Sequence, residues 1–372
     1  MSSTAAESLT RARADQARIE MRRASALRLW LGTLALLIVA MILIGGATRL
    51  TDSGLSITEW KPVYGVIPPS NEKEWQEEFL AYQATPQYKL INRDMTITGF
   101  KSIFWPEYFH RLLGRLIGIV FAVPLVVFAL RRSISKALLW RMIGILFLGG
   151  MQGGIGWIMV KSGLQDNPYV SHLKLALHLS LAFIIFALIL WTIFDIIYHY
   201  RPDIIAEKCP TTTYRIWFAL LCIQIVFGGF MAGLHAGLIY NTWPTMNGEF
   251  LPDGVFSPPA AMKDDSSSLA SRMLHNIAFI QFTHRTVAVF LVIGFLLWWY
   301  SYRDYIEKNR LNNASICLFS IIFIQFVLGV LTLIYHVPLS VALFHHFTAL
   351  ILWTAALFLL YKLSYCRNQN QH

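Results

Sequence analysis

The 372-residue sequence contains only four cysteines, Cys209, Cys222, Cys317 and Cys366. No two of them are spaced as CxxC, which excludes a zinc ribbon and a thiol-redox motif. None falls in a segment that we assign to an outer loop, so no disulfide is expected outside the cytoplasm. The chemistry of this chain is therefore expected from other residues.

Charge is also scarce, because only 14% of the residues are charged and 56% are hydrophobic. With a mean hydropathy of +0.51, the chain has too little polar surface for a soluble protein of this length. Apolar windows of about 20 residues, the length that crosses a bilayer, recur along it. We predict an all-α membrane protein with eight transmembrane helices, near 29–48, 107–130, 138–158, 173–198, 214–234, 276–300, 314–334 and 339–361.

The net charge of +10 is concentrated in particular connections. More than half of the 31 basic residues lie in the first tail, in the connections after the even-numbered helices, and at the end of the chain. The positive-inside rule then makes both termini cytoplasmic. We assign 1–28 and 363–372 to cytoplasmic tails and 201–213 to a cytoplasmic linker. No basic stripe with interleaved aromatics is present, so no nucleic-acid partner is expected.

Four pairs of short segments repeat in register between the two halves of the sequence. Gly45-Gly46 corresponds to Gly228-Gly229, and Glu107-Tyr108-Phe109-His110-Arg111 corresponds to Gln281-Phe282-Thr283-His284-Arg285. Gln152 and His178 correspond in the same way to Gln325 and His345. We therefore predict two pseudo-symmetric four-helix bundles of the same orientation, 29–200 and 214–362, related by an axis along the membrane normal.

Four histidines, His110, His178, His284 and His345, fall on the second, fourth, sixth and eighth helices. A single histidine within a membrane more often bonds a neighbouring helix than binds a metal. Here the repeat places two imidazoles at similar depth in each half, within about two turns of the outer helix ends. That is the pattern of a bis-histidine haem site. A zinc or di-iron site would need more ligands, including repeated carboxylates.

Charged residues beside these histidines break the symmetry. Glu107 lies one helical turn before His110, whereas the second half has Gln281. Its simplest roles are to pair with Arg111 or Arg115 or to be exposed at the membrane interface, but the asymmetry suggests that one half performs chemistry and the other holds a cofactor. Arg111, Arg115 and Arg285 could bind haem propionates, or they could anchor helix ends at the membrane surface.

Two further features have open interpretations. The outer segments 49–106 and 235–275 are long enough to form a lid over an outward-facing site, or they are ordinary turns. Glycines at 149, 150, 153, 154 and 156 permit either close helix packing or contact with a flat macrocycle.

Together, the quoted segments resemble the haem A synthase family over nearly the whole chain. The resemblance also rests on Gly45–Ser56, on Gln152-Gly153-Gly154-Ile155-Gly156-Trp157 and on Tyr240-Asn241-Thr242-Trp243-Pro244. It implies conversion of haem O to haem A, for cytochrome oxidase, by two hydroxylations of the C8 methyl group through haem I, followed by dehydration. It also implies a resident haem b, with its iron, on His284 and His345. His110 and His178 would face the substrate haem, and Glu107 would be functional.

The absence of a cysteine pair in the first outer segment resembles the cysteine-free branch of proteobacteria and mitochondria. Because no long presequence precedes the first helix, we expect a bacterial inner-membrane protein with its haem sites toward the outer face. Haem O synthase is an expected partner for substrate handover. The sequence leaves the electron donor and the formation of a homo-oligomer open.

Three alternatives remain at this point. His346, where the family commonly has Gln, competes with His345 as a ligand, and the repeat register favours His345. A dihaem b-type electron carrier without catalysis would also fit the histidines, although it would need neither Glu107 nor long outer loops. A two-repeat transporter is disfavoured, because no charged or broken helix lies at midmembrane.

Overall fold

The structure is a computed structural model that describes residues 3–60, 64–164, 168–198, 210–259, 262 and 268–368. Most of the predicted linker 201–213, and the ends of the chain at 1–2 and 369–372, lie outside the described residues. In chain order the elements are α1 (Ser3–Leu50), η1 (Tyr64–Val66), α2 (Glu72–Gln83), α3 (Pro86–Leu90), α4 (Ile97–Leu130), α5 (Lys136–Gly163), α6 (His172–Tyr198), α7 (Thr211–Gly233), η2 (Ala236–Leu238), α8 (Leu269–Met273), α9 (Ile277–Ser301), α10 (Arg303–Lys308), α11 (Asn312–Ile334) and α12 (Leu339–Asn368).

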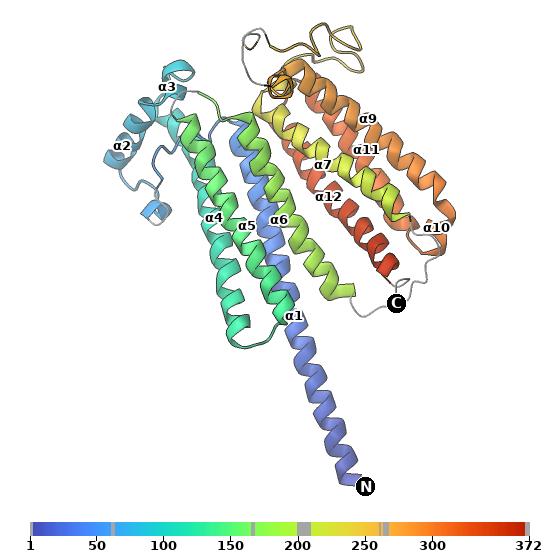
Figure 1. Ribbon diagram of the computed structural model, residues 1–372. Coiled ribbons are helices and arrows are strands. Elements are labelled where there is room, and N and C mark those ends of the chain that lie inside the picture. The colour runs from blue at the N-terminus through green and yellow to red at the C-terminus, as the bar shows by residue number, and fades with distance from the viewer. Residues whose placement is uncertain are drawn as a thin grey trace.

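Eight helices of the described chain are long and apolar enough to cross a membrane, which confirms the predicted fold class. They are α1 from Met21, α4, α5, α6, α7, α9, α11 and α12 as far as Ser364. In Figure 1 the start of α1 and the end of α12 lie at one end of the helices, and α2 and α3 lie at the other. We call these the inner and the outer end.

The second membrane helix starts earlier than predicted, at Ile97 instead of 107. Thr96 caps the start of the helix, because its hydroxyl accepts a hydrogen bond from the amide of Gly99, and the helix continues through Pro106. His110 consequently lies well beyond the second turn of α4, so its predicted depth relative to the helix start was wrong.

The extra turns of α4 are stabilised by the first outer segment. Aromatic side chains of α2 pack against them, and the cluster comprises Trp75, Phe79, Tyr82, Phe100, Phe104 and Tyr108. Asn71 caps α2 by accepting a hydrogen bond from the amide of Glu74. Burial of these rings offsets the backbone hydrogen bond that Pro106 cannot donate. The first outer segment is thus a folded layer on the outer end of α4.

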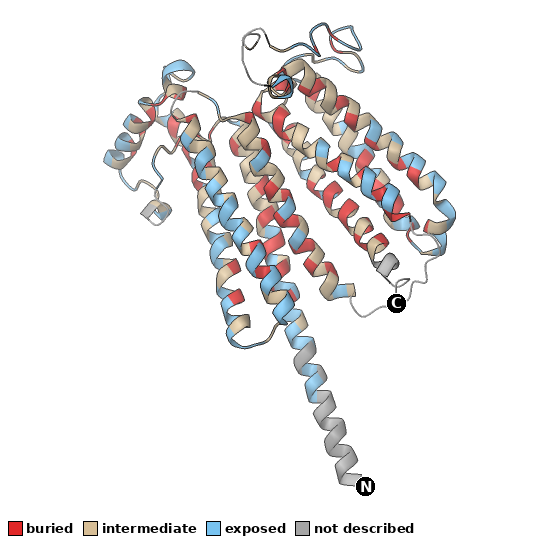
Figure 2. Ribbon diagram, in the orientation of Figure 1, coloured by how far each residue is buried: buried red, intermediate tan, exposed pale blue. Residues whose placement is uncertain are grey.

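The main hydrophobic core occupies the inner parts of all eight membrane helices. It runs from Leu27 to Ile42 on α1 and from Leu181 to Phe194 on α6, and includes Leu350–Leu363 on α12. Two buried rings there donate to main-chain carbonyls: the Tyr214 hydroxyl to Ala356 at 2.9 Å, and Nε1 of Trp217 to Leu291 at 2.9 Å. Figure 2 shows many buried residues where the two sets of helices meet. The outer parts of the helices, where the histidines lie, are outside this core.

The membrane helices form two neighbouring groups (Figure 1). α1, α4, α5 and α6 pack together, as do α7, α9, α11 and α12, and α6 meets α7 while α1 meets α12. The α6–α7 contact is very close, because a Cβ added at Gly233 would lie 2.6 Å from the Cα of His172. One added at Gly229 would lie 2.9 Å from the Cα of Ala176. Glycine is required here because two backbones touch.

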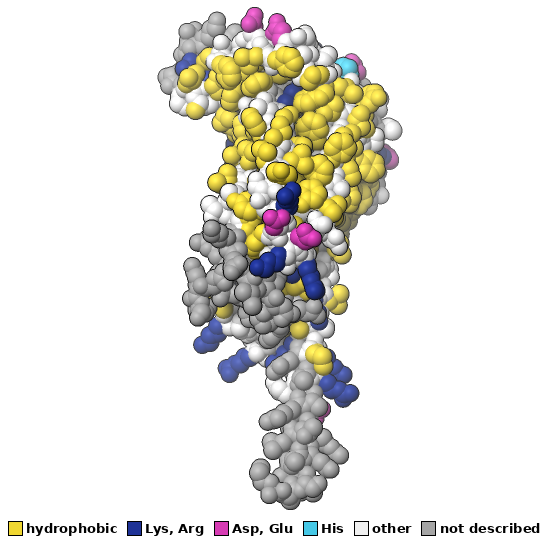
Figure 3. All heavy atoms as spheres, turned by 90° about the vertical axis from the view of Figure 1, so that its right-hand side faces the viewer, with side chains coloured by type: hydrophobic (Ala, Val, Ile, Leu, Met, Phe, Trp, Pro, Cys, Tyr) yellow, Lys and Arg dark blue, Asp and Glu magenta, His cyan; other side chains and the backbone are white. Residues whose placement is uncertain are grey.

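The face formed by the second group is largely apolar. Figure 3 shows hydrophobic side chains in a band over this face, with many lysine and arginine side chains below the band, toward the inner end. This distribution suits a protein whose apolar belt is solvated by lipid.

The α6–α7 contact yields a prediction about stability. Gly233→Ala should lower the stability of the folded protein by about 1–3 kcal/mol, because the backbone of α6 must shift to admit the methyl group. Thermal unfolding in detergent, followed by circular dichroism, measures the effect. Gly118→Ala on α4 is the matched control, since nothing lies within 4 Å of its added Cβ. Equal melting temperatures for the two variants would contradict the close contact.

Candidate functional site

The structure brings the four predicted histidines together as two pairs. His110 on α4 is close enough to His178 on α6 for their rings to interact electrostatically. His284 on α9 and His345 on α12 are related in the same way. Each pair lies within one group of membrane helices, on its outer part. Two neutral imidazoles on two helices can hold one metal centre between them.

Each histidine ring rests against a glycine of a neighbouring helix. A Cβ added at Gly45 of α1 would lie 3.0 Å from Cε1 of His110, and one at Gly156 of α5 would lie 3.0 Å from Cε1 of His178. In the second group the distances are 3.5 Å from Gly228 to His284 and 3.0 Å from Gly329 to His345. The repeat therefore preserves the glycine as well as the histidine.

Glutamines lie beside three of the histidines. Nε2 of Gln224 is 3.3 Å from Nε2 of His284, and Nε2 of Gln325 is 3.3 Å from Nε2 of His345. In the first group Gln152 donates instead to the backbone carbonyl of His178, at 3.0 Å. The repeat counterpart of Gln224 is Met41, so the first group lacks one of these amides.

The rings also have unused hydrogen-bonding capacity. Nδ1 is buried without a hydrogen-bond partner in all four histidines. Buried polar atoms are usually satisfied, so orphaned ring nitrogens in repeat-related pairs indicate groups that bind something else. Paired imidazoles with glycine contacts, and without thiolates, fit haem iron as a ligand set.

His346 points away from its neighbour's site. A Cβ added at Gly46 would lie 2.3 Å from Nδ1 of His346, so this ring packs on α1 of the other group. Its Nε2 is buried without a hydrogen-bond partner. His345, by contrast, faces His284 and Gly329, as the repeat register favours.

Glu107 is buried, with 3% of its surface exposed, and its carboxylate holds the first outer segment. Oε2 accepts hydrogen bonds from the Ser56 hydroxyl at 2.7 Å and from the Ile57 amide at 2.8 Å. Oε1 forms an ion pair of 2.5 Å with Arg111. The simplest predicted role of Glu107, pairing with Arg111, is thus present in the structure, together with a loop contact that the sequence did not predict.

Gln281 holds the equivalent loop as a hydrogen-bond donor, whereas Glu107 acts as an acceptor. Its Nε2 donates to the carbonyl oxygens of Ala236 at 3.1 Å and Ile239 at 2.6 Å. In the repeat Ile239 corresponds to Ser56, which donates to Glu107. The two side chains therefore fix equivalent backbone, but only the first group places a carboxylate there.

Arg111 and Arg285 clamp the loops in the same way. Arg111 donates to the carbonyls of Ile57 at 2.8 Å and Glu59 at 3.0 Å, and its guanidinium lies 5.5 Å from the Trp60 ring centre. In the second group Arg285 donates to the carbonyls of Tyr240, Thr242 and Thr245 and lies 5.9 Å from the ring of Trp243.

These partners correspond one by one at an offset of 183 residues, from Ile57 to Tyr240, Glu59 to Thr242, and Trp60 to Trp243. The structure gives both guanidinium groups backbone partners, whereas the sequence offered haem propionates or anchoring at the membrane surface. Arg115 lies one turn beyond Arg111 on α4, with Nη1 buried.

A polar junction joins the two groups at the outer end. Asp52 and its repeat counterpart His235 both have a φ of 50°, and His235 Nε2 lies 3.3 Å from Asp52 Oδ1. Arg49 pairs with Asp52 at 2.5 Å and reaches Nδ1 of His235 at 3.2 Å. Burial alone would raise the pKa of the Asp52 carboxyl, but the hydrogen bond from His235 and the charge of Arg49 outweigh it and lower that pKa.

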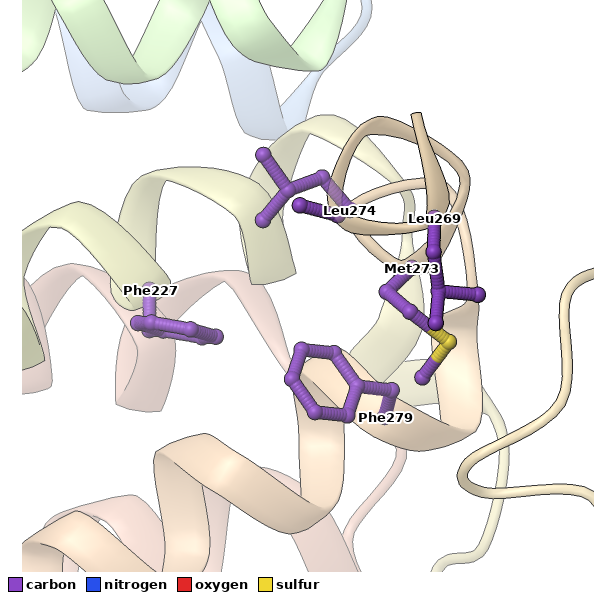
Figure 4. Close-up of a pocket in the computed structure, with 6 residues that line it drawn as sticks. Phe227, Leu269, Met273, Leu274 and Phe279 are labelled. Carbon is purple, nitrogen blue, oxygen red and sulfur yellow. The ribbon is translucent and has the colours of Figure 1, made fainter. Parts of the chain in front are cut away.

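Two cavities lie outside the histidine pairs. One, of about 590 Å³, is lined only by apolar residues of α7, α8 and α9, including Phe227, Met273 and Phe279 (Figure 4). Its walls offer no polar group for chemistry. The other, of about 230 Å³, lies between Trp60, Arg111, Trp157 and Lys161, at the outer end of the first group.

The sequence model of a protein family matches residues 28–357 of this chain, and that family is described as cytochrome oxidase assembly protein. The chain belongs to this family. It is similar to proteins named heme A synthase from Allorhizobium ampelinum, 44% identical over 90% of this chain and 89% of the relative, and from Wolbachia pipientis of Culex pipiens, 41% identical over 92% and 98%. The protein of that name from Nitrosospira multiformis is 40% identical over 90% and 92%.

The loop clamps yield a prediction. Arg285→Met should expose the outer loop around residues 240–249 to protease at least ten-fold faster, because three carbonyls lose a charged donor, each such bond contributing about 1.5–3 kcal/mol. Limited proteolysis with mass spectrometry measures the rate. Arg303→Met is the control, since Arg303 also lies over a ring, that of Tyr300 at 5.4 Å. Equal rates for both variants would contradict the clamp.

Proposed function

We propose that this chain oxidises the C8 methyl group of haem O to the formyl group of haem A. Two successive hydroxylations, through haem I, and a dehydration achieve this conversion. The relatives named heme A synthase support the proposal, since each aligns over about nine-tenths of this chain. The observation that carries it is structural: two equivalent histidine pairs, of which only one has a buried carboxylate one turn away.

The two pairs have different roles in this proposal. His284 and His345 would hold a resident haem b through its iron, supported by Gln224 and Gln325, which lie beside their ring nitrogens. His110 and His178 would face the substrate haem. The bound haem supplies the electron-transfer chemistry, while the protein supplies ligands, orientation and electrostatics.

Glu107 acts in the substrate half as a positioning residue. Its carboxylate is fully engaged by Ser56, Ile57 and Arg111, so the loop from Ser53 to Trp60 is held over the outer end of α4. This loop would exclude water above His110 and fix the substrate's position relative to the ring. A negative charge at that place also holds Arg111, which in turn holds the loop carbonyls.

The cellular setting follows from charge and chemistry. The protein would lie in a bacterial inner membrane with its basic inner end in the cytoplasm, so that both histidine pairs lie toward the outer face. Because farnesylated haem O is very apolar, it would arrive through lipid or by handover from haem O synthase. Each hydroxylation would insert one oxygen atom of dioxygen into a C–H bond and release the other as water, which takes two electrons and two protons, so an electron donor is needed as a partner.

Pigment analysis tests the proposal. Extracts of the purified wild-type protein should contain haem b together with haem O, I or A, whereas Glu107→Gln should retain haem b and lose at least ten-fold of the oxidised products. Glu74→Gln is the matched control, because Glu74 also accepts a backbone hydrogen bond from a serine, at 2.7 Å from Ser70, in the same outer segment. Haem b alone under turnover conditions would instead identify an electron carrier.

The glycine contacts give a second test of the resident site. Gly329→Ala should weaken haem b retention, because its methyl group would press at 3.0 Å on the ring of His345. Gly228→Ala should not, since 3.5 Å from His284 is an ordinary contact distance. Haem content per protein, measured by pyridine haemochrome, distinguishes the two. Equal losses would contradict placement of the haem by these contacts.

A further inference from the structure

The cavity of about 230 Å³ at the outer ends of α4 and α5 lies in the first half of the repeat. Its walls include Trp60 and Glu59 from the first outer segment, Arg111 from α4, and Trp157 and Lys161 from α5. Arg111 follows His110, and Trp157 follows the glycine that touches His178. The cavity therefore lies at about the depth of His110 and His178 along α4 and α5.

At the repeat-related positions the second half has apolar side chains. Trp157 and Lys161 correspond to Val330 and Ile334 at the offset of 173 that relates α5 to α11. Gly153, with nothing within 4 Å of its added Cβ, corresponds to Phe326, whose ring packs on Trp243 at 5.5 Å. If Trp157 and Lys161 only anchored α5 at the membrane surface, the second half would be expected to have similar residues. The polar side chains therefore distinguish the half that would receive substrate.

The charged side chains in the wall of this cavity indicate which kind of ligand it would bind. Arg111 is neutralised by Glu107 and binds loop carbonyls. Lys161 is exposed, and its ammonium lies 5.1 Å from the centre of the Trp157 ring. Among the described residues, no carboxylate forms an ion pair with it. Lys161 is thus the cation available to a ligand, whereas Glu59 in the same wall repels anions.

We propose that this cavity binds a propionate carboxylate of the porphyrin substrate, with Lys161 as the anion-binding residue. The inference rests on the proposed function, because it assigns the substrate haem to His110 and His178. An ammonium at the membrane surface binds a carboxylate well, since the low polarity nearby strengthens the charge-assisted hydrogen bond. Trp60 and Trp157 would flank the edge of the macrocycle.

A binding titration tests this without measuring turnover. Iron protoporphyrin IX and its dimethyl ester are titrated into the full chain in phosphatidylcholine nanodiscs, and the Soret shift is followed. The step that belongs to the substrate half is the one that His178→Ala removes. Lys161→Met should raise the Kd of that step about five-fold for the free acid, the size of one partly exposed charged hydrogen bond. The Kd of the ester should not change.

Two further variants separate charge from packing. Glu59→Gln should lower the Kd of the free acid, because a repelling charge is removed. Lys101→Met should change nothing, although Lys101 likewise lies over a tryptophan, at 5.0 Å from Trp75, in the same outer region.

The proposal is overturned if Lys161→Met leaves the free acid unchanged, or if it weakens acid and ester equally. It is also overturned if the effect appears only with phosphatidylglycerol, which would identify a lipid headgroup as the ligand. If no step depends on His178, the assignment of the substrate half fails first, together with the proposed function.

Discussion

The contact between an imidazole ring and a glycine on the next helix determines the geometry of both sites. Gly45, Gly156 and Gly329 each allow a ring within 3.0 Å of the position that a Cβ would take, and Gly228 allows one at 3.5 Å. These rings lie on the outer parts of the helices. The dense hydrophobic core lies at the inner end, and it holds the bundle together. Stability and chemistry are thus separated along the membrane normal, which leaves the outer region free to hold a flat, apolar cofactor.

The two halves share one arrangement of helices because of the duplication. A few residue differences at equivalent positions make the halves unequal. Both halves clamp their outer loops with an arginine and a tryptophan at equivalent positions. The halves differ where a substrate would need access and charge: Glu107 against Gln281, Gly153 against Phe326, and Lys161 against Ile334. Each difference makes the first half more open or more polar. An electron carrier would need no such difference, whereas an enzyme that keeps one haem and receives another would need it.

The sequence predicted the eight spans, because hydropathy is a long-range signal that survives local irregularity, and the internal repeat related the four histidines as two pairs. The prediction failed at the start of α4, because aromatic packing from α2 extends the helix outward to Ile97, beyond the apolar run. It also missed the loop clamps, since a guanidinium at this depth suggests propionates or the membrane surface, and the competing backbone carbonyls are brought close only by the fold. The offset of 183 that relates Trp60 to Trp243 was a signal for these clamps. The close packing of Gly233 on His172 depends on backbone approach, which no local pattern predicts.

We propose that the equivalent histidine pairs perform unequal tasks, one holding a resident haem and the other receiving substrate. Low-temperature electron paramagnetic resonance of the purified, oxidised protein tests this division, because a bis-imidazole ferric haem gives a low-spin signal. The signal of the resident haem should disappear in His345→Ala and persist in His110→Ala. Loss of that signal in His110→Ala, with retention in His345→Ala, would contradict it.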